Sequence, residues 1–389
     1  MSEIKNEIIP QNGETEFYQQ VADLLIAARK YAKRQMDNTI AITYYEVGRM
    51  IVEREQEGQK RARYGSKLIK GLSEYLSESI GKGFSVVNLK NMRKFYQVYS
   101  PSIQQSTPLE LEKGQSTTAL FEKSNLLANF FDGDLQIRQS LTAQFNLSWT
   151  HYQVLMRIEN EQARRFYEIE AKKMQWSVKD LSREVGSSLY ERLALSRDKD
   201  KIMELAKAGQ LVENPRDIFK APYVFEFSGL EERPEYSEDD LETALIDNLQ
   251  KFLLELGKGF LFEARQKRFS FDEKSFYIDL ILYNRLLQCY VVIDLKIGEV
   301  EHRDLGQIMM YVNYFDRYVI EKHEKPTIGI LLCSKKNDNI VELTLPENAN
   351  IYAKEYNLYL PDKKLLQRKL TEWVEEFEEI HGGTDDEAD

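Results

Sequence analysis

The sequence predicts a protein of mixed α and β structure (α+β or α/β), in which a helical amino-terminal half precedes a domain built on a sheet. Residues 16–57, 67–76 and 86–99 have apolar residues at helical spacing. Residues 260–296 instead contain three β-rich apolar segments. A helix precedes these segments, and a helix and a last strand follow them. The expected order of the second domain is therefore helix, strand, strand, strand, helix, strand (αβββαβ).

Composition shifts divide the chain into two expected domains. Pro215, Pro222 and Pro234 mark the passage between them, which we place near residue 220. Residues 100–118 have the composition of a linker, rich in Ser, Thr, Gln and Pro. The expected divisions are a helical domain over 14–220 with a variable loop near 100–140, a second domain over 221–371, and an acidic tail over 372–389.

The helical half contains an element that is typical of helix-turn-helix geometry. Helices are expected over 67–76 and 86–99, with glycines between them and Ser85 as the N-cap of the second helix. The second helix carries three cations suited to phosphates or to a major groove: Lys90, Arg93 and Lys94. Surface helices are often basic, so DNA contact and a solvated face are both open for these residues.

Two further helices are expected in this half, over 149–171 and 178–192. Ser177 is the expected N-cap of the second, with Asp180 at the capping-box position. Trp149 and Trp176 are interpreted as anchors of helix packing, because isolated aromatic residues near helix starts usually fill cores.

Composition agrees with a two-domain protein that has no membrane partner. The 389 residues are 42% hydrophobic and 30% charged, which is enough chain to bury two cores. No apolar run approaches the roughly 18 residues that span a bilayer, and the charged start is unlike a secretory signal, so we expect a cytoplasmic location. Cys289 and Cys333 fall in β-rich segments and are expected to be buried thiols. Nothing predicts a small-molecule cofactor.

The net charge of −11 conceals an asymmetry along the chain. Residues 29–94 contain 15 Lys or Arg against 7 Asp or Glu, whereas residues 372–389 contain 9 acids and no Lys or Arg. The basic segment could therefore contact the phosphates of DNA, and the acidic tail is expected to be solvated.

The apolar segment Tyr290–Lys296 contains the charges that point to chemistry. Alternation along a strand places Asp294 and Lys296 on one face. An unmatched buried ion costs several kcal/mol, so the strand must pair these groups, lead them to a cleft or give them a metal ion. An ion pair at a sheet edge is the structural alternative.

The preceding β-rich segment, residues 276–283, contains Asp279 and suggests a hairpin. A turn centred between Leu286 and Leu287 sets Asp279 directly opposite Asp294, where Cβ atoms lie about 4.5 to 5.5 Å apart and two carboxylates can share a divalent ion. A tighter turn would instead pair Asp279 with Tyr290, and shared metal binding would fail. Both registers are open from the sequence.

A carboxylate, a hairpin and then Asp-x-Lys resemble the core of the PD-(D/E)xK nuclease superfamily. The motif here is Ile278-Asp279 followed by Asp294-Leu295-Lys296, with Ile in place of Pro and Asp as the second acid. The resemblance implies that Asp279 and Asp294 hold Mg²⁺, for which Mn²⁺ would substitute, with the carbonyl of Leu295 as a further ligand. Lys296 is implied to orient water and to offset charge on the phosphate.

Residues on the flanking elements extend this predicted site. Gln307 and Tyr311 share one helix face and resemble the Gln-x-x-x-Tyr element of some of these nucleases, which contacts nucleic acid beside the metal. Glu242, on the helix before the first strand, could supply a third carboxylate, or it could simply favour the helix start. On that strand, Arg265, Gln266 and Arg268 could bind phosphate or face solvent.

The chain resembles more narrowly the YhcG-type nucleases. The resembling stretches include Ala264–Arg268, Asp294–Lys296 and Gly306-Gln307, and in the helical half Arg63–Gly65 and Leu147–Trp149. The resemblance covers most of the chain and implies DNA as the substrate.

The expected activity is Mg²⁺-dependent hydrolysis of DNA phosphodiester bonds, in a setting such as recombination, repair or defence. Two other functions remain open: a DNA- or protein-binding module that does not cut, and a helix-turn-helix regulator. The helical half could also join copies into a homo-oligomer, although no heptad run in the sequence identifies that contact.

Overall fold

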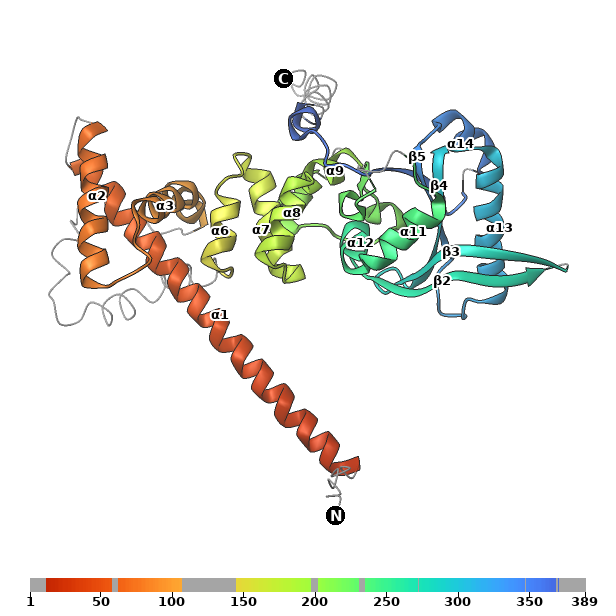
Figure 1. Cartoon of the computed structure of the whole chain (residues 1–389), viewed down its shortest axis with the longest axis horizontal. Helices are drawn as coiled ribbons and strands as arrows, with labels where there is room; N and C mark the ends of the chain where they lie inside the picture. Colours follow the sequence, from red (N-terminus) through yellow and green to blue (C-terminus); the bar gives the residue numbers. More distant parts are fainter. Residues whose placement is uncertain are drawn as a thin grey trace, which may run out of the picture. The chain divides into compact units, whose positions relative to one another are not determined.

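The computed structural model describes residues 12–57, 62–106, 145–196, 202–230, 235–271, 273–346, 348–368 and 370. The chain forms two compact units, residues 1–159 and 160–389, and each is described by itself (Figure 1). No helix among the described ranges has both the length and the apolar character needed to cross a membrane.

The first unit is helical. Its described helices are α1 (Asn12–Glu57), α2 (Ala62–Ser79), α3 (Val86–Ser106) and α6 (Trp149–Leu155). An aromatic cluster joins α1, α3 and α6, in which Phe95 lies within 6 Å, ring centre to ring centre, of Tyr45, Tyr152 and Trp149. The interpretation of Trp149 as a packing anchor is confirmed. Gly48 lets α1 and α3 approach closely, because a Cβ there would lie 2.1 Å from the carbonyl oxygen of Met92.

The helix-turn-helix element is present as α2, a glycine turn and α3. Gly81 and Gly83 both have positive φ, which favours glycine, and the amide of Asn88 donates to the hydroxyl of Ser85 over 3.3 Å. Ser85 is therefore the N-cap, as expected. The expectation of a loop from residue 100 is wrong at its start, because α3 continues through Pro101 to Ser106. Residues 107–144 lie outside the described residues.

The second unit begins with short helices and continues into the sheet domain. The helices are α7 (Glu161–Met174), α8 (Val178–Gly186), α9 (Leu189–Leu195), α10 (Ile202–Ala208), α11 (Glu238–Asp247), α12 (Leu249–Leu256), α13 (His302–Tyr318) and α14 (Asp338–Thr344). The capping box of Ser177 and Asp180 is confirmed at the start of α8.

Three expected helices are each divided in two. Residues 149–171 split because Asn160 starts a new helix, its side chain accepting from the amide of Ala163. Residues 178–192 split at Ser188, which has a left-handed backbone with φ 55°. The helix expected before the first strand divides into α11 and α12 at Asn248. Each break lies at a residue type that favours caps and turns.

The sheet has six strands in the order β1-β6-β5-β4-β3-β2. The strands are β1 (Tyr223–Val224), β2 (Phe260–Phe271), β3 (Lys274–Asn284), β4 (Cys289–Glu299), β5 (Ile328–Lys335) and β6 (Ile351–Asn357). The pairs among β1, β6, β5 and β4 are parallel, and those among β4, β3 and β2 are antiparallel. From α11 to β5 the chain follows the expected αβββαβ order, with α14 and β6 added.

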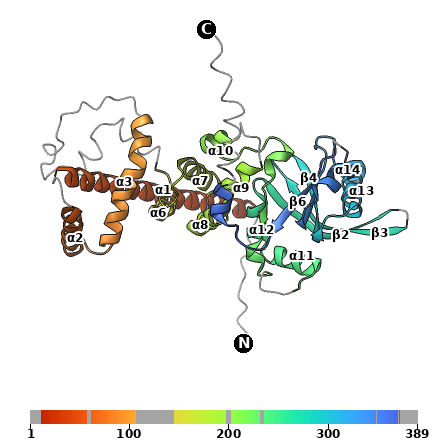
Figure 2. The same cartoon turned by 90° about the horizontal axis from the view of Figure 1, so that it is seen from above.

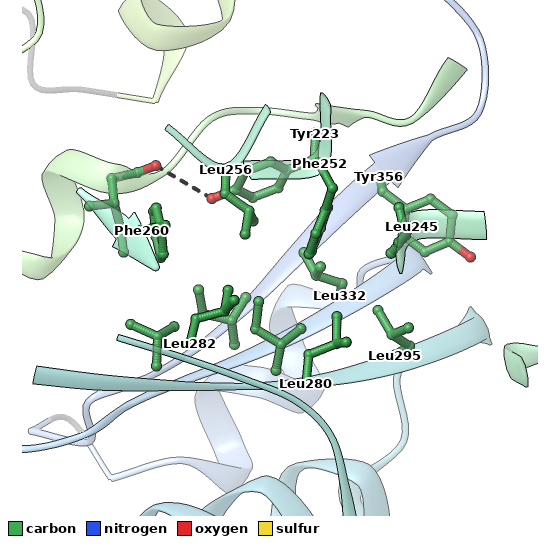
Figure 3. Packing of buried hydrophobic residues seen from close by; sticks show 14 of the residues in the cluster. Tyr223, Leu245, Phe252, Leu256, Phe260, Leu280, Leu282, Leu295, Leu332 and Tyr356 are labelled. Atoms are coloured by element: carbon green, nitrogen blue, oxygen red, sulfur yellow. Dashed lines mark hydrogen bonds between the residues drawn. The ribbon is translucent and has the colours of Figure 1, made fainter. Parts of the chain in front are cut away.

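Helices cover both faces of the sheet (Figures 1 and 2). On the face of α11 and α12, Leu245, Phe252 and Leu256 pack against Leu280, Leu295 and other strand residues (Figure 3). On the other face, Ile308 and Val312 of α13 pack on Val292 and Ile281. Gly329 of β5 allows this approach, since a Cβ there would lie 2.8 Å from Val312. Burial on both sides explains why β4 and β5 read as continuous apolar runs.

A buried network of charges joins the short helices to the sheet domain. Glu255 of α12 is fully buried and pairs with Arg192 of α9, which is also fully buried. Arg183 of α8 lies 3.4 Å from the same carboxylate, and Lys220 lies 4.0 Å from it. These contacts cross the expected boundary near 220, and residues 160–220 belong to the compact unit of the sheet domain. That boundary stays a prediction.

Candidate active site

The hairpin of β3 and β4 has the register that brings the two acids together. The ladder runs from Asn284 paired with Cys289 to Leu280 paired with Ile293, so Asp279 and Asp294 occupy the next position, where the ladder ends. The side chain of Asn284 fixes the turn by accepting from the amides of Leu286 and Leu287 over 3.0 and 3.1 Å. The register with the turn between Leu286 and Leu287 is confirmed, and the tighter turn is wrong.

Asp279 is held by both neighbouring strands. Its carboxylate accepts from the amide of Leu295 over 2.8 Å and from the side-chain amide of Gln266 over 3.1 Å. Burial raises its pKa to about 6 and the charge of Glu242 adds to the rise, although both hydrogen bonds act in the opposite direction. The backbone of Leu295 thus meets the site through its N–H, and its carbonyl stays a predicted metal ligand.

Asp294 lies directly opposite Asp279 in this register, and it is 8% exposed. Burial raises its pKa to about 8, and the charges of Asp279, Glu238 and Asp304 add to the rise. Gln307 of α13 approaches its Oδ1 over 3.5 Å, the long limit of a hydrogen bond. Two carboxylates side by side with raised pKa values are poised to bind a cation.

Lys296 points to the same face as Asp294 and pairs with Asp304, over 3.5 Å. Asp304 also accepts from the amide of Glu301 over 2.9 Å, so it caps α13 while it positions the lysine. From the sequence, Asp304 is recognisable only as the start of a helix. An acid in the first turn is already favoured by the helix dipole, so the sequence gives no sign that Asp304 also pairs with Lys296.

Gln307 and Tyr311 form a chain of hydrogen bonds that leads from Asp294 to the backbone of β3. The amide of Gln307 donates to the hydroxyl of Tyr311 over 2.7 Å, and that hydroxyl donates to the carbonyl of Tyr277 over 2.7 Å. Tyr311 is 2% exposed. It therefore ties α13 to β3 and orients Gln307, and its burial disfavours direct contact with a nucleic-acid strand.

Glu242 reaches the site from α11 through Gln266. The amide of Gln266 donates to Glu242 as well as to Asp279, so one side chain holds both carboxylates in place. Gln266 has a positive φ of 46°, which marks an irregularity in β2 beside the site. Arg265 is half exposed and lies 4.0 Å from Glu242. The phosphate-binding role of Gln266 stays a prediction, and its side chain contacts Glu242 and Asp279.

The remaining predicted nucleic-acid contacts lie on exposed surfaces. Arg268 donates to the hydroxyl of Ser275 over 3.1 Å. Both residues lie in the part of the β2–β3 hairpin that does not pair with β4. On α3, Lys90 and Lys94 are exposed, whereas Arg93 forms an ion pair with Glu55 over 2.9 Å. Lys90 and Lys94 are therefore the better presented cations of that helix.

The donor set fits a divalent cation held by few protein ligands. Within the described ranges, no three His, Cys, Asp or Glu side chains are close enough together to hold an ion among them. The set available is the pair Asp279 and Asp294, with Glu242 held nearby by Gln266. Mg²⁺ commonly takes one or two carboxylates and fills its other positions with water and substrate phosphate. The pair meets that requirement.

A cavity of about 920 Å³ lies elsewhere, where β4, β5 and β6 begin. It is lined by residues that include Arg216, Cys289, Lys325 and Tyr352. None of the predicted site residues lines it. Cys289 and Cys333 are buried free thiols, as expected.

Comparisons with known proteins agree with this architecture. Residues 216–371 match the family model of the YhcG PDDEXK nuclease domain, and residues 20–112 and 107–192 match that of the DUF1016 N-terminal domain. The chain is 37% identical over 370 residues to "Putative nuclease YhcG" of Escherichia coli strain K12. This match covers 92% of this chain and 95% of that protein.

A repair endonuclease of known structure from Pyrococcus abyssi is 19% identical, with a TM-score of 0.22, over 34% of this chain and 50% of that chain. So small a likeness adds nothing to the assignment. The extended match to the relative from Escherichia coli and the two family models together are sufficient. The chain belongs to the family of YhcG nucleases with a PD-(D/E)xK domain.

Proposed function

We propose that this protein is a metal-dependent deoxyribonuclease that hydrolyses phosphodiester bonds at the site of Asp279, Asp294 and Lys296. One observation carries the proposal: the two acids occupy facing positions where β3 and β4 separate, beside an ammonium group, in a domain of a nuclease family. The family supports nuclease activity. DNA as substrate, the identity of the metal and a role in recombination, repair or defence are further parts of the proposal.

Asp279 and Asp294 would hold Mg²⁺, with the Leu295 carbonyl and Glu242 as further candidates. The bound ion would act as a Lewis acid on the phosphate. A water oxygen would form a bond to phosphorus and give up a proton to solvent, while the bond to one sugar oxygen breaks and the departing oxygen takes a proton from solvent. Lys296, held by Asp304, orients the water and offsets the charge that builds on the phosphate. Gln307 positions Asp294, and Tyr311 acts through Gln307.

The helical unit would contribute to DNA affinity through Lys90 and Lys94. Both are exposed on the second helix of the helix-turn-helix element. Such contacts to phosphates position the nucleic acid without reading its sequence. A protein that binds without cutting remains the second candidate, because the same surfaces would serve it. The cytoplasmic location stays a prediction.

Asp294→Asn and Lys296→Ala test the activity. We expect each to reduce cleavage of duplex, branched and single-stranded DNA by about 100-fold or more. Asp294→Asn removes a carboxylate that would hold the metal ion, and Lys296→Ala removes the cation that offsets charge in the transition state. Lys172→Ala, an exposed lysine on α7, is the control and should cut like the wild type. Cleavage is measured with Mg²⁺, with Mn²⁺ and with EDTA. Equal cleavage by all variants would place the activity elsewhere, and binding without any cleavage would favour the second candidate.

A further inference from the structure

The first half of α1 presents an apolar stripe that no described residue of its own unit covers. Phe17, Val21, Leu24 and Tyr31 are 60%, 40%, 69% and 66% exposed. In contrast, Ala41, Ile42 and Tyr45 in the second half of the same helix are at most 7% exposed, because they pack in the helical unit. Residues 15–36 therefore form about 30 Å of helix whose apolar stripe is exposed to solvent.

The spacing of the stripe is that of a coiled coil. Phe17, Val21, Leu24, Ala28 and Tyr31 follow one another at intervals of four, three, four and three residues, which keeps them on one seam as two helices wind about each other. The sequence shows no long heptad run here, because Ala28 is small and the next seam position is Gln35. A solitary helix with such a stripe is marginal in water, so the exposed seam requires a partner.

The distribution of charged residues along this part of α1 indicates that the partner is a second copy of the chain. Residues 12–28 contain no Lys or Arg, whereas Glu16 and Asp23 lie among them. Residues 24–36 contain no Asp or Glu, whereas Arg29 lies among them. A second copy laid parallel would set acid on acid and base on base. A second copy laid antiparallel sets the acidic end of each helix on the basic end of the other, as a two-fold contact between identical surfaces requires.

We propose that residues 15–36 of α1 form an antiparallel two-helix contact with a second copy of this chain. Seam positions interleave when partner numbers sum to 52. Leu24 then lies on Ala28 of the partner copy, so a large side chain meets a small one. The contact does not depend on the nuclease site, and its test measures mass.

The test compares two apolar residues on the same helix. Leu24 is on the seam, and Ile26, which is 61% exposed, is two positions further and faces away from it. By light scattering after gel filtration, the full-length wild type should have twice the chain's 45.7 kDa. Leu24→Glu should be monomeric, with dimer affinity reduced at least about 100-fold. Ile26→Glu should remain dimeric. Circular dichroism checks that both variants are folded.

Orientation is tested by disulfide cross-linking of the full-length chain, whose own cysteines are both buried. In the antiparallel arrangement Phe17 lies level with Gln35 of the partner copy. Phe17→Cys combined with Gln35→Cys should therefore cross-link two chains, and Phe17→Cys alone should not. A monomeric wild type, as a different protein on the seam would give, would overturn the proposal. So would equal masses for the two glutamate variants, or cross-linking by Phe17→Cys alone.

Discussion

Asp294 and Asp279, with pKa values raised to about 8 and 6, should make the stability of the metal-free protein depend on pH. An unfolded chain ionises Asp near pH 4, so between about pH 4 and 8 the unfolded state loses protons that the folded state still binds. The free energy of unfolding should therefore fall as pH rises through this window, by on the order of a few kcal/mol. Thermal melts in EDTA at pH 5.5 and 8.5 measure this.

Mg²⁺ should reverse the trend, since a cation favours the ionised carboxylates. We expect a larger rise in melting temperature on adding Mg²⁺ at pH 8.5 than at pH 5.5. Asp294→Asn should lose most of both effects, because the amide neither ionises nor replaces the second carboxylate. A wild type that melts identically with and without Mg²⁺ at both pH values would contradict metal binding at these acids.

Individual residues were predictable from the sequence where a simple rule placed them. Alternation put Asp294 and Lys296 on one face, and one of the two hairpin registers left open by the sequence put Asp279 opposite Asp294, which the structure confirms. The rest depended on contacts between distant elements. That Asp304 pairs with Lys296, and that Gln266 joins Glu242 to Asp279, follows from how α13 and α11 dock on the sheet. No local pattern encodes that docking.

Among the elements, α9 and α12 are joined by a buried ion pair whose loss should be costly. Arg192→Ala removes the closest cation of Glu255, and a buried charge left short of partners costs about 3 to 5 kcal/mol. We expect the free energy of unfolding to fall by that amount in urea denaturation. Arg165→Ala, which breaks an exposed pair with Glu161, should change it by less than about 1 kcal/mol. Similar losses for both would show that the pair is not buried in solution.

The boundaries of elements were less predictable than their types. The sequence indicated four of the strands and the described helices other than α10 and α14. However, α7 and α9 begin at breaks that apolar periodicity does not reveal. In the sequence, Asn160 and Ser188 are polar residues within a helical pattern. Only the structure shows that Asn160 caps α7 and that Ser188 has a left-handed backbone. The short strand β1 carries too few residues for a pattern, and it exists because Tyr223 and Val224 pair with β6.

For the whole molecule, the division near residue 220 came from prolines, and the family model of the nuclease domain begins nearby, at 216. Packing divides the chain at 159 instead. The difference has a physical source: Glu255 inside the sheet domain takes its counter-charges from Arg183, Arg192 and Lys220. A family model marks a segment that relatives share, whereas a compact unit is defined by contacts. Here Arg183 and Arg192 lie in the region of the DUF1016 N-terminal model, and both pair with Glu255 in the region of the nuclease-domain model.

Two fragments distinguish these divisions. A fragment of residues 160–389 keeps all three cations around Glu255, and we expect it to unfold in one cooperative transition by circular dichroism. A fragment of residues 221–389 leaves Glu255 buried without them, so it should be less stable by several kcal/mol or fail to fold. Replacing Glu255 by Gln in the shorter fragment removes the uncompensated charge and should restore part of the loss. If both fragments melt at the same temperature, the network contributes nothing and the division near 220 is the physical one.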